Sequence, residues 1–189
     1  MPPAPPMTKH ELRQLYKQKR AAVAADMRQL SAEISAHIWV YIQETRPRCI
    51  AAYLFAQTEP SLDVLLSDCL AMGIRILVPK HVSGEVYALA DWVPGQERLG
   101  PYGMREPMGP DVAVSPDLWL IPGLAFDGFG TRLGYGKGIY DRLLKGATGT
   151  LLGVCPSCCV SDSLVADDWD VAMHGVVTEL GCVMAAPAE

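Results

Sequence analysis

The sequence predicts an α/β protein: a single-domain three-layer α/β/α sandwich with a mainly parallel central sheet. Continuous apolar runs of strand length alternate with segments of helical periodicity, as expected when helices cover both faces of a sheet. The 189 residues suit one domain with a sizeable core, and no repeat or linker divides them. Residues 1–7, MPPAPPM, are expected to form a disordered tail, and residues 8–189 the single domain.

Two helices are expected before the first strand. The tetrapeptide Thr8-Lys9-His10-Glu11 has the Thr-x-x-Glu form of a capping box, which predicts a helix start. Helical spacing gives this helix one apolar stripe and a basic opposite face; the stripe consists of Leu12, Leu15, Tyr16, Lys19 and Val23. A second helix is expected over residues 31–46, because Pro47 disfavours its continuation.

Strands and helices alternate after residue 48. Apolar runs of strand length predict strands at 49–55, 75–79, 118–125 and 150–154, with a further strand beginning at 175–178. Helices are expected at 61–72 and 139–145. Residues 85–92 alternate between apolar and polar and predict an edge strand, whereas the prolines and glycines of 94–116 favour an irregular loop.

Composition argues against several classes of protein. The net charge of −5 and the pI near 5.3 disfavour a nucleic-acid binder, which usually carries a basic face. No apolar run reaches the ~18–20 residues of a membrane span, and the N-terminus lacks the features of a signal peptide, so a cytoplasmic protein is expected. The thiols of Cys155, Cys158 and Cys159 are expected to be reduced, without a metal or redox function, since no second CxxC accompanies them.

Residues 121–144, IPGLAFDGFGTRLGYGKGIYDRLL, carry the strongest functional signal. A predicted strand leads into a glycine-rich loop and then a helix, the place where open α/β sheets bind ligands. Glycines let the backbone approach a phosphate, Arg132 and Lys137 supply cations, and Asp141 is a possible magnesium ligand. A tight connection without a ligand explains the glycines equally well, because their spacing fits neither the Walker nor the Rossmann motif.

The string PGLAFDGFGTRLGYGKGIYDRLL resembles the signature PGxAFDxxGxRLGxGxGxYDRxL of the 5-formyltetrahydrofolate cyclo-ligase family, also called methenyltetrahydrofolate synthetase. The resemblance extends over nearly the whole chain. It includes Lys9-x-x-x-Arg13, the acidic Glu59, Tyr102-Gly-Met-Arg-Glu-Pro107, Asp168-Trp-Asp170 and Val176-Val-Thr-Glu179.

The resemblance implies an enzyme that closes 5-formyltetrahydrofolate to 5,10-methenyltetrahydrofolate, with ATP as co-substrate and Mg²⁺. In this chemistry the γ-phosphoryl group moves to the formyl oxygen, the second folate nitrogen attacks the carbon, and phosphate leaves. The protein is expected to act on small molecules as a monomer or a dimer, without nucleic-acid or membrane partners.

The same resemblance assigns roles to individual residues. It places ATP at Lys9, Arg13, Arg132, Leu133, Gly134, Tyr135, Gly136, Lys137, Gly138, Ile139 and Tyr140. It places the folate at Arg13, Glu59, Tyr102, Tyr135, Gly136, Lys137, Gly138 and Ile139. Lys137, Arg132 and Tyr135 are the implied catalytic residues, and Asp141 and Asp170 the implied metal ligands. Without the resemblance, Lys9 and Arg13 fit a solvated helix face, and Asp170 fits a surface loop.

The chain also departs from the family pattern. Ser61 and Leu62 replace an acid and a threonine that are common there, and the cysteine-rich stretch 155–159 replaces a different sequence. These departures leave two alternatives open. One is an ATP-dependent paralogue acting on another formylated or pterin-like compound, and the other is a non-catalytic folate-binding protein.

Overall fold

The computed structural model describes residues 7–56 and 58–186, so the predicted tail, Met7 apart, lies outside the described residues. In this part of the chain the central sheet has eight strands, in the order β13-β12-β10-β7-β1-β2-β3-β6. Their bounds are β1 Cys49–Ala51, β2 Arg75–Ser83, β3 Val86–Asp91, β6 Asp111–Val112, β7 Leu118–Pro122, β10 Thr150–Val154, β12 Gly175–Thr178 and β13 Gly181–Met184. The strands from β12 to β2 in this order are parallel, and the strands outside them pair antiparallel.

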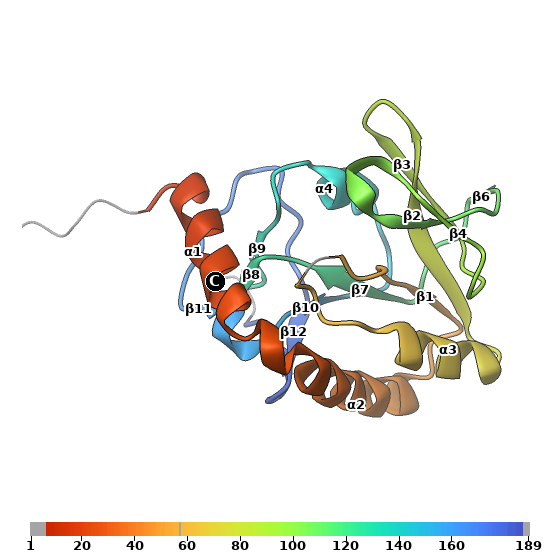
Figure 1. Cartoon of the computed structure of the whole chain (residues 1–189), viewed down its shortest axis with the longest axis horizontal. Coiled ribbons are helices and arrows are strands. Elements are labelled where there is room, and N and C mark those ends of the chain that lie inside the picture. Colours follow the sequence, from red (N-terminus) through yellow and green to blue (C-terminus); the bar gives the residue numbers. More distant parts are fainter. Residues whose placement is uncertain (1–6, 57, 187–189) are drawn as a thin grey trace, which may run out of the picture.

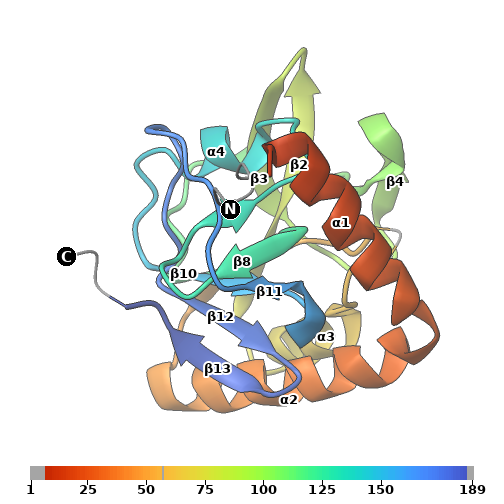
Figure 2. The ribbon, with the colours of Figure 1, turned by 90° about the vertical axis from the view of Figure 1, so that its left-hand side faces the viewer.

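Both faces of the sheet are covered, which confirms the predicted fold class (Figures 1 and 2). Helices α2 (Met27–Thr45) and α3 (Asp63–Ala71) pack on one face, where Ile34, Ile38 and Leu66 are fully buried. On the other face, α1 (Lys9–Ala22) and α4 (Ile139–Leu143) share a core with a small sheet. That sheet has the order β11-β8-β9 and consists of Val160–Ser161, Ala125–Asp127 and Arg132–Leu133. The sequence did not predict it.

Helix starts show how far local chemistry determines the elements. The capping box at Thr8 is confirmed: its side chain accepts from the Glu11 amide, and the Glu11 carboxylate accepts from the Thr8 amide at 2.8 Å. The second helix begins at Met27 rather than Ser31, directly after a 3₁₀ turn (Ala24–Asp26). Its end is close to the prediction, because Arg46 adopts a left-handed conformation with φ 50°.

Several predicted strand boundaries were wrong. The segment 49–55 leaves the sheet after Ala51, although Tyr53 and Leu54 stay buried. The segment 118–125 divides after Pro122, and its continuation from Ala125 joins the small sheet. In each of these two segments the residues inside the strand and those beyond it are buried and apolar. Hydrophobicity alone therefore does not distinguish a strand from a buried loop.

The predicted loop 94–116 contains regular structure. A hairpin pairs β4 (Glu97–Leu99) with β5 (Arg105–Pro107), joined by a 3₁₀ turn at Pro101–Gly103, and β6 follows. Because β6 pairs with β3, the predicted edge strand lies one position inside the sheet. None of the helices in the described ranges combines the length and hydropathy needed to cross a membrane.

The order of the strands identifies a natural binding position. From β1 the chain passes through α3 to β2 on one side, and it later returns to β7 on the other side of β1. Ligands in open α/β sheets bind beyond the carboxyl ends of strands at such a reversal. The carboxyl ends of β1 and β7 lead into residues 52–62 and the glycine-rich loop, the two segments expected to carry the site.

Candidate active site

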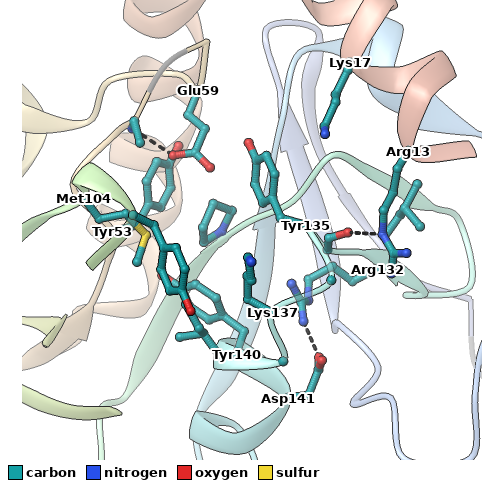
Figure 3. Close-up of a pocket in the computed structure, with 18 of the residues that line it drawn as sticks. Arg13, Lys17, Tyr53, Glu59, Met104, Arg132, Tyr135, Lys137, Tyr140 and Asp141 are labelled. Atoms are coloured by element: carbon teal, nitrogen blue, oxygen red, sulfur yellow. Dashed lines mark hydrogen bonds and ion pairs between the residues drawn. The ribbon is translucent and has the colours of Figure 1, made fainter. Parts of the chain in front are cut away.

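A cavity of about 340 Å³ lies at the carboxyl ends of β1 and β7 (Figure 3). Its walls come from α1, from the loop after β1, from the β4–β5 hairpin and from the glycine-rich loop. The lining residues are Lys9, Arg13, Lys17, Tyr53, Leu54, Ala56, Glu59, Tyr102, Met104, Pro122, the continuous run 132–141, and Asp170. The volume falls in the range of about 300–1,000 Å³ typical of small-molecule sites.

All the site residues predicted from the sequence line this one cavity. Residues from position 9 to position 170 are thus brought together, while their individual roles stay predictions. Sequence reasoning missed Lys17, Tyr53, Leu54, Ala56, Met104 and Pro122, which also line it. Lys17 could have been found, because it follows Lys9 and Arg13 at four-residue spacing on one helix face. Tyr53, Leu54 and Pro122 fall in predicted strands and Met104 in the predicted loop, so their positions in the sequence did not indicate a site.

The glycine-rich loop depends on backbone conformations that glycine adopts readily. Gly136 and Gly138 have φ values of 87° and 64°, where a side chain would be strained. A Cβ atom at Gly136 would lie 3.3 Å from the guanidinium carbon of Arg13, whose Nε donates to the Gly134 carbonyl at 3.0 Å. Helix α1 therefore holds the loop directly. Helix α4 is only five residues long, so phosphate binding here would depend on the loop and its cations rather than on a helix dipole.

Two carboxylates face the cavity with cations beside them. Asp141 pairs with Arg132, and the carboxylate of Asp170 accepts from the Lys9 ammonium at 2.9 Å. Lys9 also reaches Asp167 at 2.6 Å. Burial opposes ionisation of Asp170, but the Asp167 amide and Lys9 hold its pKa below the usual value. Burial likewise opposes the charge on Lys9, yet the two aspartates raise the pKa of its ammonium.

This donor set fits a shared metal ion better than a dedicated cage. Among the residues of the described ranges, no group of three or more His, Cys, Asp and Glu side chains gathers to hold a metal. Magnesium is commonly bound through one or two carboxylates together with substrate phosphates. Asp141 and Asp170 line the same cavity, and the charge of Arg132 acts on both of them, so this pair of carboxylates fits such a requirement.

The opposite part of the cavity is aromatic and contains one acid. Glu59 is 7% exposed, and its Oε2 accepts from the Ala56 amide at 2.9 Å. Burial raises the pKa of the Glu59 carboxyl above 4.5. In Figure 3 the Glu59 carboxylate and the Tyr135 hydroxyl point toward one another, with Tyr53 close by. A flat ligand with a hydrogen-bonding edge fits such a surface.

Tyr102 lies at the mouth of the cavity, on the turn of the β4–β5 hairpin. It is 64% exposed and has a φ of 65°, which is uncommon for a residue other than glycine. The Lys137 ammonium lies 4.6 Å from the centre of its ring, a cation–π contact. The hairpin thus contacts the glycine-rich loop across the cavity.

The three neighbouring cysteines lie outside this lining. Cys155 and Cys159 are buried, and the Sγ atoms of Cys158 and Cys159 are 3.9 Å apart. Burial raises the pKa of Cys155 strongly and that of Cys159 to about 12. Reactive thiolates need the opposite shift, so Cys155 and Cys159 fit a packing role in the core that they share with Tyr16 of α1.

The model of the 5-formyltetrahydrofolate cyclo-ligase family matches residues 6–179 of the sequence. The chain belongs to the 5-formyltetrahydrofolate cyclo-ligase family. This confirms the resemblance found in the glycine-rich signature, and the matched range includes every predicted site residue.

Individual members of the cyclo-ligase family are similar over nearly their full lengths. A protein of Mycolicibacterium smegmatis named 5-formyltetrahydrofolate cyclo-ligase is 32% identical over 184 residues, covering 92% of this chain and 94% of the relative. The solution structure of a 5,10-methenyltetrahydrofolate synthetase from Aquifex aeolicus superposes with a TM-score of 0.84 at 32% identity, covering 97% and 95%. A Mycoplasma pneumoniae 5,10-methenyltetrahydrofolate synthetase, 23% identical and covering 92% and 99%, has the same fold with a TM-score of 0.73.

Proposed function

We propose that this chain is a 5-formyltetrahydrofolate cyclo-ligase, with residues 8–189 as its catalytic domain. It would convert 5-formyltetrahydrofolate to 5,10-methenyltetrahydrofolate and ATP to ADP and phosphate. The observation that carries the proposal is the convergence of five cations, a glycine-rich loop and a buried acid in one cavity of a chain from this family.

The proposed ATP site is the side of the cavity formed by α1 and the glycine-rich loop. Lys9, Arg13, Arg132 and Lys137 would neutralise the phosphates, and Leu133–Tyr140 would surround them with backbone amides. Phosphoryl transfer needs positioning and charge neutralisation more than covalent help from the protein. The contact of Arg13 with the Gly134 carbonyl supports a loop already arranged for this purpose.

The proposed folate site is the side containing Glu59, Tyr102 and Tyr135. Glu59 would accept hydrogen bonds from the polar edge of the pterin, and Tyr102 would stack on its face. Lys137, Arg132 and Tyr135 lie on the loop between the two sides and would act where the formyl oxygen meets the γ-phosphate. There they would stabilise the charge that develops during transfer and exclude water.

Asp141 and Asp170 would hold Mg²⁺, which when bound would neutralise phosphate charge. Before ligands bind, Asp141 pairs with Arg132, and the contact with Lys9 helps to hold the pKa of Asp170 below its usual value.

The alternative of a paralogue with another substrate was motivated by the departures at 61–62 and 155–159. Leu62 is fully buried in the core beneath α2, and the Ser61 amide donates to Ser31 Oγ at 3.0 Å. Neither these two residues nor the cysteines line the cavity among the described residues. The departures therefore alter packing around the site, which favours the family substrate over the alternative.

The test is to mix the purified protein with 5-formyltetrahydrofolate and Mg-ATP and follow the near-ultraviolet absorbance of methenyltetrahydrofolate. Product that needs both ATP and metal supports the proposal. Absence of product with ATP binding intact would favour the paralogue, and folate binding without ATP binding would favour a folate-binding protein.

We further propose a cytoplasmic enzyme that works as a monomer, with a dimer as the alternative, and without nucleic-acid or membrane partners. The net charge of −5 disfavours binding to nucleic acid and to anionic membrane surfaces, because like charges repel. Light scattering on the purified protein would distinguish the monomer from the dimer.

A further inference from the structure

Arg20, in the last turn of α1, is a buried charge that does not line the cavity. Only 1% of the residue is exposed, against the expectation of a basic solvated face on this helix. Its guanidinium donates to Thr58 Oγ1 at 3.1 Å, to the Gly123 carbonyl at 3.0 Å and to the Tyr135 hydroxyl. Lys19, expected on the apolar stripe, is exposed instead.

The partners of Arg20 belong to three separate walls of the site. Thr58 precedes Glu59 in the loop after β1, Gly123 follows β7, and Tyr135 lies in the glycine-rich loop. The planar guanidinium presents donors in a fixed fork, so one side chain sets the relative positions of three segments. Lysine has a single mobile ammonium and cannot reproduce this geometry.

Arg20 also influences which group the Tyr135 hydroxyl contacts. Because that hydroxyl accepts from the guanidinium, its own proton is available for the neighbouring Glu59 carboxylate. Burial raises the pKa of Glu59, and the contacts with the Ala56 amide and Tyr135 and the charge of Arg20 all oppose that rise. Arg20 and Tyr135 thus favour the ionised form of the Glu59 carboxylate, which is the group proposed to accept from the pterin edge.

The Arg20 guanidinium is buried, and its hydrogen-bond partners are uncharged groups. Removing such a charge from water costs free energy that direct ion pairing does not offset here. Replacing a buried charge by an apolar side chain of similar volume is often neutral or stabilising, so packing alone does not account for it. The arrangement is explained if the position of Tyr135 and of the Glu59 loop matters for ligand binding.

We propose that Arg20 is a positioning residue for the folate half of the site: it fixes Tyr135 and the loop carrying Glu59 without touching the ligand. The inference rests on the proposed cyclo-ligase function. It predicts that loss of the guanidinium fork weakens folate binding more than ATP binding, because Thr58 adjoins Glu59 on the proposed folate side and Arg20 donates to none of the side chains proposed to neutralise the phosphates.

The test compares Arg20→Lys and Thr58→Val with Lys19→Met, a matched control that removes an exposed cation from the same helix. KM for 5-formyltetrahydrofolate, KM for Mg-ATP and kcat are measured for each, with folate affinity by titration calorimetry in the absence of ATP. Arg20→Lys should raise the folate KM and Kd about tenfold or more, and Thr58→Val about threefold, with the KM for ATP changed less than about twofold. Lys19→Met should behave like wild type.

Because Thr58→Val leaves the guanidinium in place, it tests the proposal even if Arg20→Lys fails to fold. The double variant Arg20→Lys/Tyr135→Phe adds a second test: if Arg20 acts through Tyr135, the combined effect on folate KM is smaller than the product of the single effects. Unchanged folate KM, or equal changes for both substrates with a lowered Tm, would overturn the positioning role. Wild-type protein that neither turns over nor binds the folate would instead refute the proposed function.

Discussion

Lys137→Ala separates a functional role from a structural one. The side chain is exposed, and its ammonium lies 4.6 Å from the centre of the Tyr102 ring. A cation–π contact at an exposed site contributes about 0.5–1 kcal/mol, so the free energy of unfolding should fall by no more than about 1 kcal/mol. A single preorganised donor to a developing charge contributes about 2.7–4 kcal/mol, so kcat should fall by about 10²–10³-fold.

The assay is formation of methenyltetrahydrofolate with saturating Mg-ATP, alongside urea unfolding of the same preparations. Lys145→Ala is the matched control, since Lys145 is exposed beyond α4 and outside the cavity lining. A kcat for Lys137→Ala within about threefold of wild type would refute the assignment. The loss of a transition-state contact worth about 2.7–4 kcal/mol would lower kcat by much more than that. A large fall in stability would point to a structural role that the exposed geometry does not predict.

Three further substitutions test two acids of the site and one cysteine outside it. Asp141→Asn should abolish turnover while the fold persists, and isothermal titration should show weaker Mg-ATP binding; unchanged titration would contradict a metal role. Glu59→Gln should raise the folate KM yet stabilise the fold at pH 7. Burial raises the folded-state pKa of Glu59 above 4.5, so the protonated acid stabilises the fold below that pH and this contribution is lost as pH rises through the folded-state pKa. The difference in Tm should therefore vanish below about pH 4.5. Cys158→Ser should leave kcat within about twofold and Tm nearly unchanged, since its half-buried thiol makes only a weak contact with the Lys19 carbonyl; metal release with loss of activity would contradict this.

Local patterns predicted which residues line one cavity better than they predicted the boundaries of the sheet. The run 132–141 forms one continuous wall of the cavity, so a contiguous signature was enough to locate it. The strand predicted at 118–125 divides because the chain turns after leaving the central sheet at Pro122, with a bend at Leu124. A Cβ atom at Gly123 would lie 2.7 Å from the Phe126 ring, so the turn depends on a packing partner that periodicity does not reveal.

Arg20 is an example of a residue whose proposed role cannot be predicted from local sequence patterns. Its partners are 38, 103 and 115 positions away, and a basic residue in a last helical turn normally suggests a solvated end that favours the helix dipole. Arg20 is buried because the segments that contain Thr58, Gly123 and Tyr135 fold around its side chain. Lys17 is the opposite case, because its four-residue spacing from Arg13 already placed it on the correct helix face.

The pairing of Lys9 with Asp170 joins parts of the chain that are 161 positions apart. During synthesis, α1 leaves the ribosome long before its acidic partners, and contacts of such wide separation form slowly. A nascent chain that has not reached Asp167 already contains the complete glycine-rich signature, but it lacks Asp170, one of the two proposed magnesium ligands. With the proposed role of Asp170, catalytic competence is therefore acquired late in synthesis, after six of the eight described strands of the central sheet have been made.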